Sequence, residues 1–134
     1  PDLERLGATL SPAQEQDVLL AWAIGATSNS NTITLVRNRM LIGNGVGQQD
    51  RVGAAELAVL RAKRSGHDTE GAVAYSDSFF PFPDGPKVLI DAGIGVILAT
   101  DTPKPHEAVR TICQERGVTL LLLPDAKARG FFGH

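Results

Sequence analysis

Asn31 is a candidate for chemistry because it closes the stretch Ser28 to Asn31 directly before a β-rich run. Its side-chain amide can donate and accept hydrogen bonds, so it can orient reacting groups and stabilise developing charge. Asn and Ser before a strand also commonly form turns by bonding their own backbone. Both interpretations of Asn31 stay open at this level.

Arg51 follows a glycine-rich stretch that runs from Gly43 to Gly47. We expect this stretch to form a tight loop, because glycine lets the backbone turn sharply and approach a ligand. A helix should begin at about Asp50, and the N–H groups of its first turn would suit an anion. Arg51 would add donors for a phosphate or a carboxamide. The alternative is an ordinary turn followed by a solvated arginine.

Phe79 lies in a proline-rich stretch, Ser76 to Gly85, that holds three of the five phenylalanines of the chain. Core aromatics usually follow the period of a helix or a strand, so this clustering is unusual for packing alone. An aromatic face can stack on a planar heterocycle. Asp84 can accept hydrogen bonds from amino or carboxamide groups. A purely structural loop is the alternative.

Alternating helices and strands must position these stretches. Ser11, Pro12 and Gln14 predict a helix start, with a capping hydroxyl, an early proline and a glutamine that reaches back. Val18, Leu19, Trp22 and Ala23 follow at helical spacing. Further helices are expected at about 50–66, 88–92 and 105–116, and strands at 31–37, 40–43, 72–75, 96–99 and 118–123. The pattern predicts one α/β domain over residues 1–134, with a mixed, mainly parallel sheet, an antiparallel edge hairpin and covering helices.

Charge balance and cysteine content exclude several functions. A formal net charge of −2 does not suggest a nucleic-acid or membrane-surface binder, although a small basic pocket for one phosphate is compatible with it. The single cysteine, Cys113, can form no intrachain disulfide, and we expect it to be a buried small hydrophobe. A single cysteine suits a reducing, cytoplasmic environment. No apolar run reaches the length of a membrane span. Because the chain starts at Pro1, we expect a fragment or a processed product.

The stretches together resemble one family, the bifunctional enzymes that join aminoimidazole carboxamide ribonucleotide (AICAR) transformylase to IMP cyclohydrolase. The transformylase part typically shows a tryptophan-bearing helix, a Ser-Asn pair opening a strand, I-G-x-G-x-G-Q-x-x-R, S-D-x-F-F-P-F-x-D-G, A-G-V and a basic-aromatic tail ending in His. The matching residues are Trp22, Ser30-Asn31, Ile42 to Arg51, Ser76 to Gly85, Ala92-Gly93-Ile94 and Arg129 to His134. Order and spacing agree from about Leu19 to the end of the chain.

This resemblance implies a cytidine deaminase-like, three-layer α/β/α fold, the second of two related lobes of the transformylase. It implies formyl transfer from 10-formyltetrahydrofolate to the amine of AICAR in de novo purine biosynthesis. The family acts as a homodimer with its active site at the subunit interface. A first lobe, whose Lys-His pair handles protons, and the cyclohydrolase domain have no counterpart in these 134 residues. We therefore expect this chain alone to be inactive, and to need the first lobe in cis or in trans.

By the same resemblance, Asn31 assists formyl transfer. Arg51, Phe79 and Asp84 would hold the nucleotide, and Arg129 is the candidate for a tail arginine that also binds it.

Several departures from the family pattern leave a second function open. The family loop near the folate is replaced here by Ala99 to Thr102, and Arg129 stands five residues rather than four before the last histidine. The alternative is a non-catalytic lobe, retained for dimerisation or for nucleotide binding. The zinc ligands of cytidine deaminases, H-x-E and P-C-x-x-C, are missing, and His67, His106 and His134 are scattered, so we expect no metal.

Overall fold

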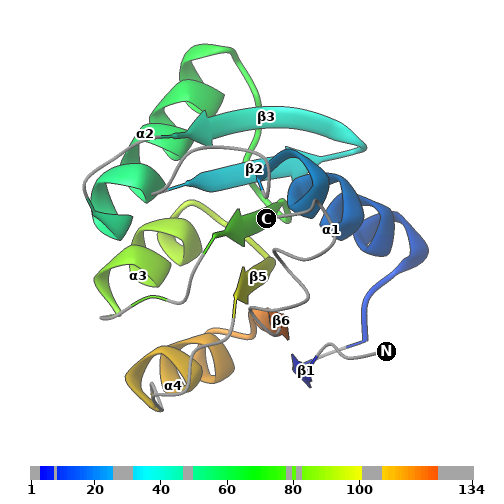
Figure 1. The fold of residues 1–134 in the computed structure, drawn as a ribbon, viewed down its shortest axis with the longest axis vertical. Coiled ribbons are helices and arrows are strands. Elements are labelled where there is room, and N and C mark those ends of the chain that lie inside the picture. Colours follow the sequence, from blue (N-terminus) through cyan, green and yellow to red (C-terminus); the bar gives the residue numbers. More distant parts are fainter. Residues whose placement is uncertain are drawn as a thin grey trace, which may run out of the picture.

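The computed structural model describes residues 4–7, 9–25, 32–46, 50–77, 80, 83–100 and 107–123. Within these ranges the chain forms one six-stranded sheet in the order β1-β6-β5-β4-β2-β3 (Figure 1). The strands are β1 (Glu4–Leu6), β2 (Ile33–Arg37), β3 (Met40–Gly45), β4 (Val73–Ser76), β5 (Val96–Thr100) and β6 (Thr119–Leu123). The helices are α1 (Pro12–Gly25), α2 (Arg51–Arg64), α3 (Asp84–Asp91) and α4 (Glu107–Glu115).

The sheet is mixed, as predicted. β4, β5 and β6 pair in parallel, and β2 runs antiparallel to both β3 and β4. Four strands, β3 to β6, therefore share one direction, and the β2–β3 hairpin forms one edge. The other edge is β1, which pairs antiparallel with β6 and was not predicted. Three residues are too few for a period-two pattern to stand out in the sequence.

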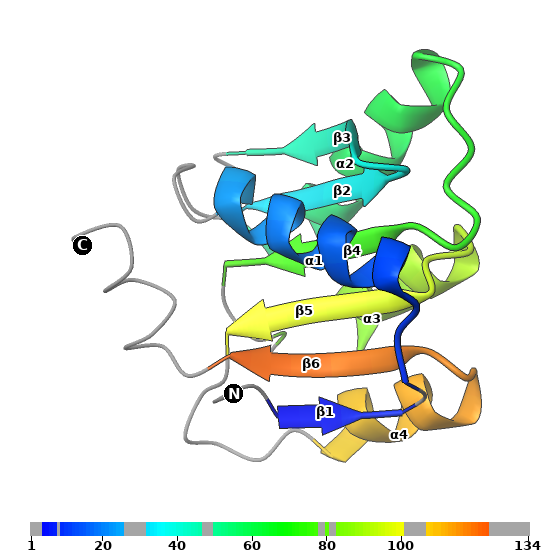
Figure 2. The ribbon, with the colours of Figure 1, turned by 90° about the vertical axis from the view of Figure 1, so that its right-hand side faces the viewer.

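Helices cover both faces of the sheet, which gives the three layers that the α/β/α prediction required. Figure 2 shows α1 crossing one face alone, while α2, α3 and α4 lie behind the sheet. Two apolar clusters fill the spaces between the layers. The larger one packs Leu35, Ile97 and Leu120 against the three helices, and the smaller one packs Val73, Tyr75 and Leu121 against α1.

α1 begins where its capping signature predicted. The Ser11 hydroxyl accepts from the Gln14 amide at 3.1 Å, and the Ser11 amide donates to the Gln14 side chain at 3.0 Å. This reciprocal pair satisfies two backbone donors at the helix start. Of the apolar residues found at helical spacing, Val18 is buried, whereas Leu19 is 62% exposed.

Asp17 lies on the buried face of α1, and its carboxylate binds the turn of the β2–β3 hairpin. Its two carboxylate oxygens accept from the amides of Asn38 at 3.1 Å and Arg39 at 2.7 Å. Both of these residues have a positive φ, 53° and 61°, a backbone conformation that residues other than glycine rarely adopt. The buried face of an amphipathic helix is normally apolar, so the helical period of the sequence could not predict that Asp17 is buried.

The glycine-rich stretch from Gly43 is a strand as far as Gly45, not the expected loop. A side chain at Gly43 would clash with the carbonyl oxygen of Ala58, and one at Gly45 with that of Ala54. Both carbonyls belong to α2, so the two glycines allow the helix backbone to rest directly on β3. They serve close packing between helix and sheet rather than the approach of a ligand.

Candidate functional site

The topology gathers Arg51, Asp77 and Asp84 at one edge of the sheet. β4, β5 and β6 all end there, and α2 starts there after β3. β2 runs the opposite way, so its first residues lie at the same edge. Ligands of open α/β sheets commonly bind at the carboxyl ends of the parallel strands.

Arg51, the first residue of α2, pairs with Asp77, the residue that follows β4. The Arg51 Nη1 and Asp77 Oδ1 atoms lie 2.5 Å apart, and the two side chains are only 11% and 13% exposed. The same Oδ1 accepts from the amide of Thr32 at 3.1 Å, and the amide of Asp77 donates to the Thr32 carbonyl at 3.3 Å. Three stretches that are distant in sequence therefore meet at Asp77.

The start of α3 packs beside Arg51 and brings Asp84 to this edge. A side chain at Gly85 would lie 2.8 Å from the ring of Phe80 and 3.6 Å from Cβ of Arg51. Phe80 is fully buried in the larger core cluster. At least one of the three clustered phenylalanines therefore packs in the core, whereas Asp84 itself is exposed.

The start of α2 is not the open anion site that the sequence suggested. Asp50 caps the helix, and its Oδ1 accepts from the Gly53 amide at 2.6 Å. The carboxylate thus takes one of the free donors and places negative charge where an anion was expected. A phosphate at this edge would need donors other than this helix end.

Three of the predicted site residues, Asn31, Phe79 and Arg129, lie outside the described residues. Of the five, the structure places Arg51 and Asp84, and it brings their two helices together. Their contact with a nucleotide stays a prediction.

Asp77 belongs to the S-D-x-F-F-P-F-x-D-G motif at Ser76 to Gly85, but the sequence predicted no role for it. The signal that points to it is its position directly after a buried strand, because residues there reach the carboxyl edge of a sheet.

Thr100, the last residue of β5, is a second feature that the sequence analysis missed. Its side chain is 2% exposed, and its hydroxyl has no hydrogen-bond partner among the residues that the structure describes. It marks the same edge of the sheet as Asp77.

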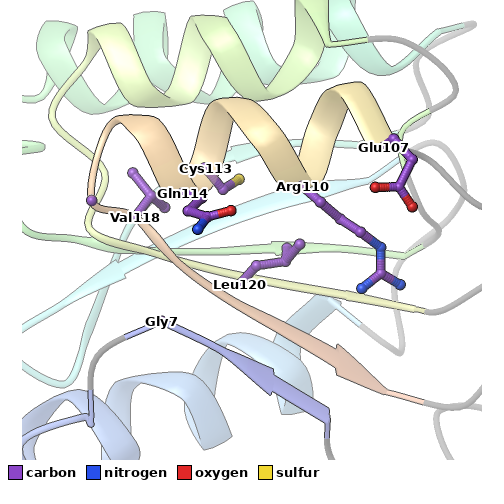
Figure 3. Close-up of a pocket in the computed structure, with 8 residues that line it drawn as sticks. Gly7, Glu107, Arg110, Cys113, Gln114, Val118 and Leu120 are labelled. Atoms are coloured by element: carbon purple, nitrogen blue, oxygen red, sulfur yellow. The ribbon is translucent and has the colours of Figure 1, made fainter.

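A groove of about 480 Å³ lies away from this edge cluster, between α4, β6 and the end of β1 (Figure 3). Cys113, Val118 and Leu120 form its apolar wall, and Glu107 and Arg110 lie toward one end. Burial raises the pKa of the Cys113 thiol to about 11. Cys113 is therefore the buried small hydrophobe that was expected, being 2% exposed.

The described ranges contain no group of three His, Cys, Asp or Glu side chains that could hold a metal ion. They also contain no helix with the length and apolar character needed to cross a membrane.

Solved structures with a similar fold include RibD proteins. Form 2 of Acinetobacter baumannii RibD matches with a TM-score of 0.59 and 16% identity, over 92% of this chain and 39% of that one. A diaminohydroxyphosphoribosylaminopyrimidine deaminase/5-amino-6-(5-phosphoribosylamino)uracil reductase from Thermotoga maritima matches with a TM-score of 0.51 and 19% identity, over 90% and 39%. At these identities the likeness shows the fold alone, and that fold is cytidine deaminase-like.

Sequence comparisons identify the family. A family model described as AICARFT/IMPCHase bienzyme matches residues 5–61. The bifunctional purine biosynthesis protein PurH of Mycobacterium ulcerans (strain Agy99) is 40% identical over 116 residues, which are 87% of this chain and 22% of that protein. PurH of Bacteroides thetaiotaomicron is 35% identical over 111 residues, which are 83% of this chain and 22% of that protein. The chain therefore belongs to the AICARFT/IMPCHase bienzyme family, and it spans about a fifth of the length of the bifunctional proteins it matches.

Proposed function

We propose that this chain is the second lobe of an AICAR transformylase and supplies part of its active site. The reaction would move a formyl group from 10-formyltetrahydrofolate to the amine of AICAR in purine biosynthesis. The observation that carries the proposal is the meeting of two motif stretches, through Arg51 and Asp77, with Thr32 at the start of β2. The 40% identity to a PurH protein supports the same activity.

The residues at this edge would work by positioning. The amine of AICAR is attached to an aromatic ring and is a weak nucleophile, so catalysis needs proximity to the formyl donor and a route for the proton. Arg51 and Asp84 would fix the nucleotide, with Phe79 packing on it and Arg129 as a further contact. Asn31 would orient the reacting groups and stabilise developing charge. The proton would pass to groups of the first lobe, in cis or in trans, within a cytoplasmic homodimer.

A non-catalytic nucleotide-binding lobe is the second candidate, and one observation from the sequence favours it. The family loop near the folate is replaced here by Ala99 to Thr102, whereas Arg51 and Asp84, the expected nucleotide contacts, are retained. Nucleotide binding without formyl transfer is compatible with that replacement.

The experiment that separates the two functions measures formyl transfer in the complete protein. We expect the wild type to consume 10-formyltetrahydrofolate only in the presence of AICAR, and Asp84→Ala to weaken AICAR binding. Asp91→Asn is the matched control, because Asp91 lies on the same helix and is about half exposed. AICAR binding without any formyl transfer would support the second candidate instead.

A further inference from the structure

We propose that Asp77 is a positioning residue, whose carboxylate holds the Arg51 guanidinium and the amide of Thr32, directly before β2, in one array. A ligand would then meet Arg51 in a single orientation. This inference rests on the proposed function, since it takes Arg51 to be a contact of the nucleotide.

Two donors from separate elements converge on one oxygen atom of Asp77. The Arg51 Nη1 lies 2.5 Å from Oδ1, and the Thr32 amide nitrogen lies 3.1 Å from it. Arg51 belongs to α2, and Thr32 directly precedes β2. A charge-assisted hydrogen bond is shorter and stronger than a neutral one, so this oxygen fixes the spacing between the two elements.

The backbone of Asp77 adds a second connection to the same strand. Its amide donates to the Thr32 carbonyl at 3.3 Å, next to the ladder pair Ile33 and Ser76. The carboxylate and the amide of Asp77 therefore bond the amide and the carbonyl of a single residue. Two hydrogen bonds hold Thr32 in one orientation relative to Asp77, which a single bond would not do.

The guanidinium is planar, so its contact with Asp77 limits its whole orientation. One engaged nitrogen restricts the directions of the remaining N–H donors. Burial reinforces this, because the Arg51 side chain is 11% exposed and its Cβ lies near the first turn of α3. A rotation of the side chain would have to break an ion pair whose two side chains are largely buried.

Two other ion pairs of the described residues are longer and more exposed. Arg116 and Asp91 approach only to 3.4 Å, with side chains 47% and 53% exposed. Arg37 and Asp68 approach to 4.0 Å, at 38% and 66%. Exposed pairs of this kind contribute little to geometry or stability, so Asp91 provides a matched control for Asp77.

The test measures AICAR binding and turnover in the complete protein. Asp77→Asn keeps an acceptor for the Thr32 amide and removes the charge, whereas Asp77→Ala removes both. We expect both variants to raise the AICAR dissociation constant and KM about tenfold, the order expected when a charge-assisted hydrogen bond that positions a binding group is lost. Asp91→Asn should change neither by more than about twofold. In an Arg51→Met background, Asp77→Asn should add no further loss of affinity.

Affinity by calorimetry, turnover and thermal melts together distinguish the outcomes. An Asp77→Asn protein that melts earlier but keeps wild-type affinity and KM would show a structural role and overturn the inference. Losses from Arg51→Met and Asp77→Asn that simply add would overturn it too. If the wild type binds AICAR without transferring a formyl group, the catalytic proposal fails while the affinity data still decide the role of Asp77. A wild type that does neither overturns both.

Discussion

Arg51 and Asn31 are expected to contribute to the reaction in different ways, Arg51 by binding the nucleotide and Asn31 by stabilising the transition state. Arg51 forms a largely buried ion pair with Asp77. Its side chain is therefore held in place without a ligand. An arginine fixed in this way binds ground state and transition state alike. An amide that stabilises developing charge acts mainly in the transition state.

Substitution of these two residues should therefore give opposite kinetic patterns. Asn31→Ala should lower kcat by about 10²–10³ and affect nucleotide affinity less. Arg51→Ala should act mainly on binding. It should also lower the free energy of unfolding by about 2–3 kcal/mol, because it leaves the Asp77 carboxylate uncompensated.

Steady-state kinetics, calorimetry and thermal melts on the complete protein give these quantities. Arg116→Ala is the control for Arg51→Ala, since its ion pair is about half exposed. If Asn31 only forms a turn before the strand, Asn31→Ala would instead cost roughly 1 kcal/mol of stability and little turnover. A variant that melts early and turns over normally would remove Asn31 from the site.

At the scale of elements, close packing of α2 on β3 is the feature that the sequence analysis misread. Capping residues are local signals, so Ser11 and Gln14 predicted where α1 begins. The helical period that starts at Val52 predicted α2 from about residue 50, but not the capping role of Asp50. The contacts of Gly43 and Gly45 are with a helix that follows several residues later in the chain. A glycine at a tight turn and a glycine under a helix look the same in one sequence.

Replacing Gly45 tests this packing directly. Gly45→Ala places a methyl group against the Ala54 carbonyl, so α2 must move away from the sheet. We expect a loss of about 2 kcal/mol or more in the free energy of unfolding, as for other overpacked sites. Gly95→Ala is the control, because its methyl would meet only ordinary contacts at 3.5 Å or more. Equal melting temperatures for the two variants would contradict the packing role.

The thiol of Cys113 on α4 should be inert in the folded protein. Its pKa is raised by burial from 9.0 to about 11, so near pH 8 the reactive thiolate is about a hundredfold rarer than in an unfolded chain. A thiol reagent should therefore modify the native protein far more slowly than the denatured protein.

The same shift sets a pH dependence of stability. The unfolded thiol ionises first as the pH rises above 9, so the contribution of Cys113 to stability should fall between about pH 9 and 11. Cys113→Val should remove this component of the pH profile. Rapid modification of the native protein at pH 8 would show that α4 opens readily.

At the scale of the whole molecule, the sheet topology explains which parts of the site were predictable. Motif order led to Arg51 and Asp84 through the family resemblance, and the alternation of elements predicted a mixed sheet between helices. Asp77 was missed because its partners come from α2 and from the start of β2, and such pairing depends on strand order. β1 was missed because it is short. Local sequence determines the elements, and their mutual placement determines the site.

The chain spans 22% of the PurH proteins it matches, and this predicts how it should behave in isolation. The edge cluster contains the expected binding groups, but the Lys-His pair that handles protons in the first lobe of the family has no counterpart in these 134 residues. We therefore expect the 134-residue chain to show no formyl transfer above the uncatalysed rate, because positioning alone supplies no general base for the released proton. Supplying the first lobe of a PurH protein, on the same chain or as a separate one, should restore turnover. The measurement is a folate-dependent assay with the lobes alone and mixed, and with Asn31→Ala in the mixture as the control against contaminating enzyme. Turnover by the purified chain alone would show that these 134 residues hold a complete active site.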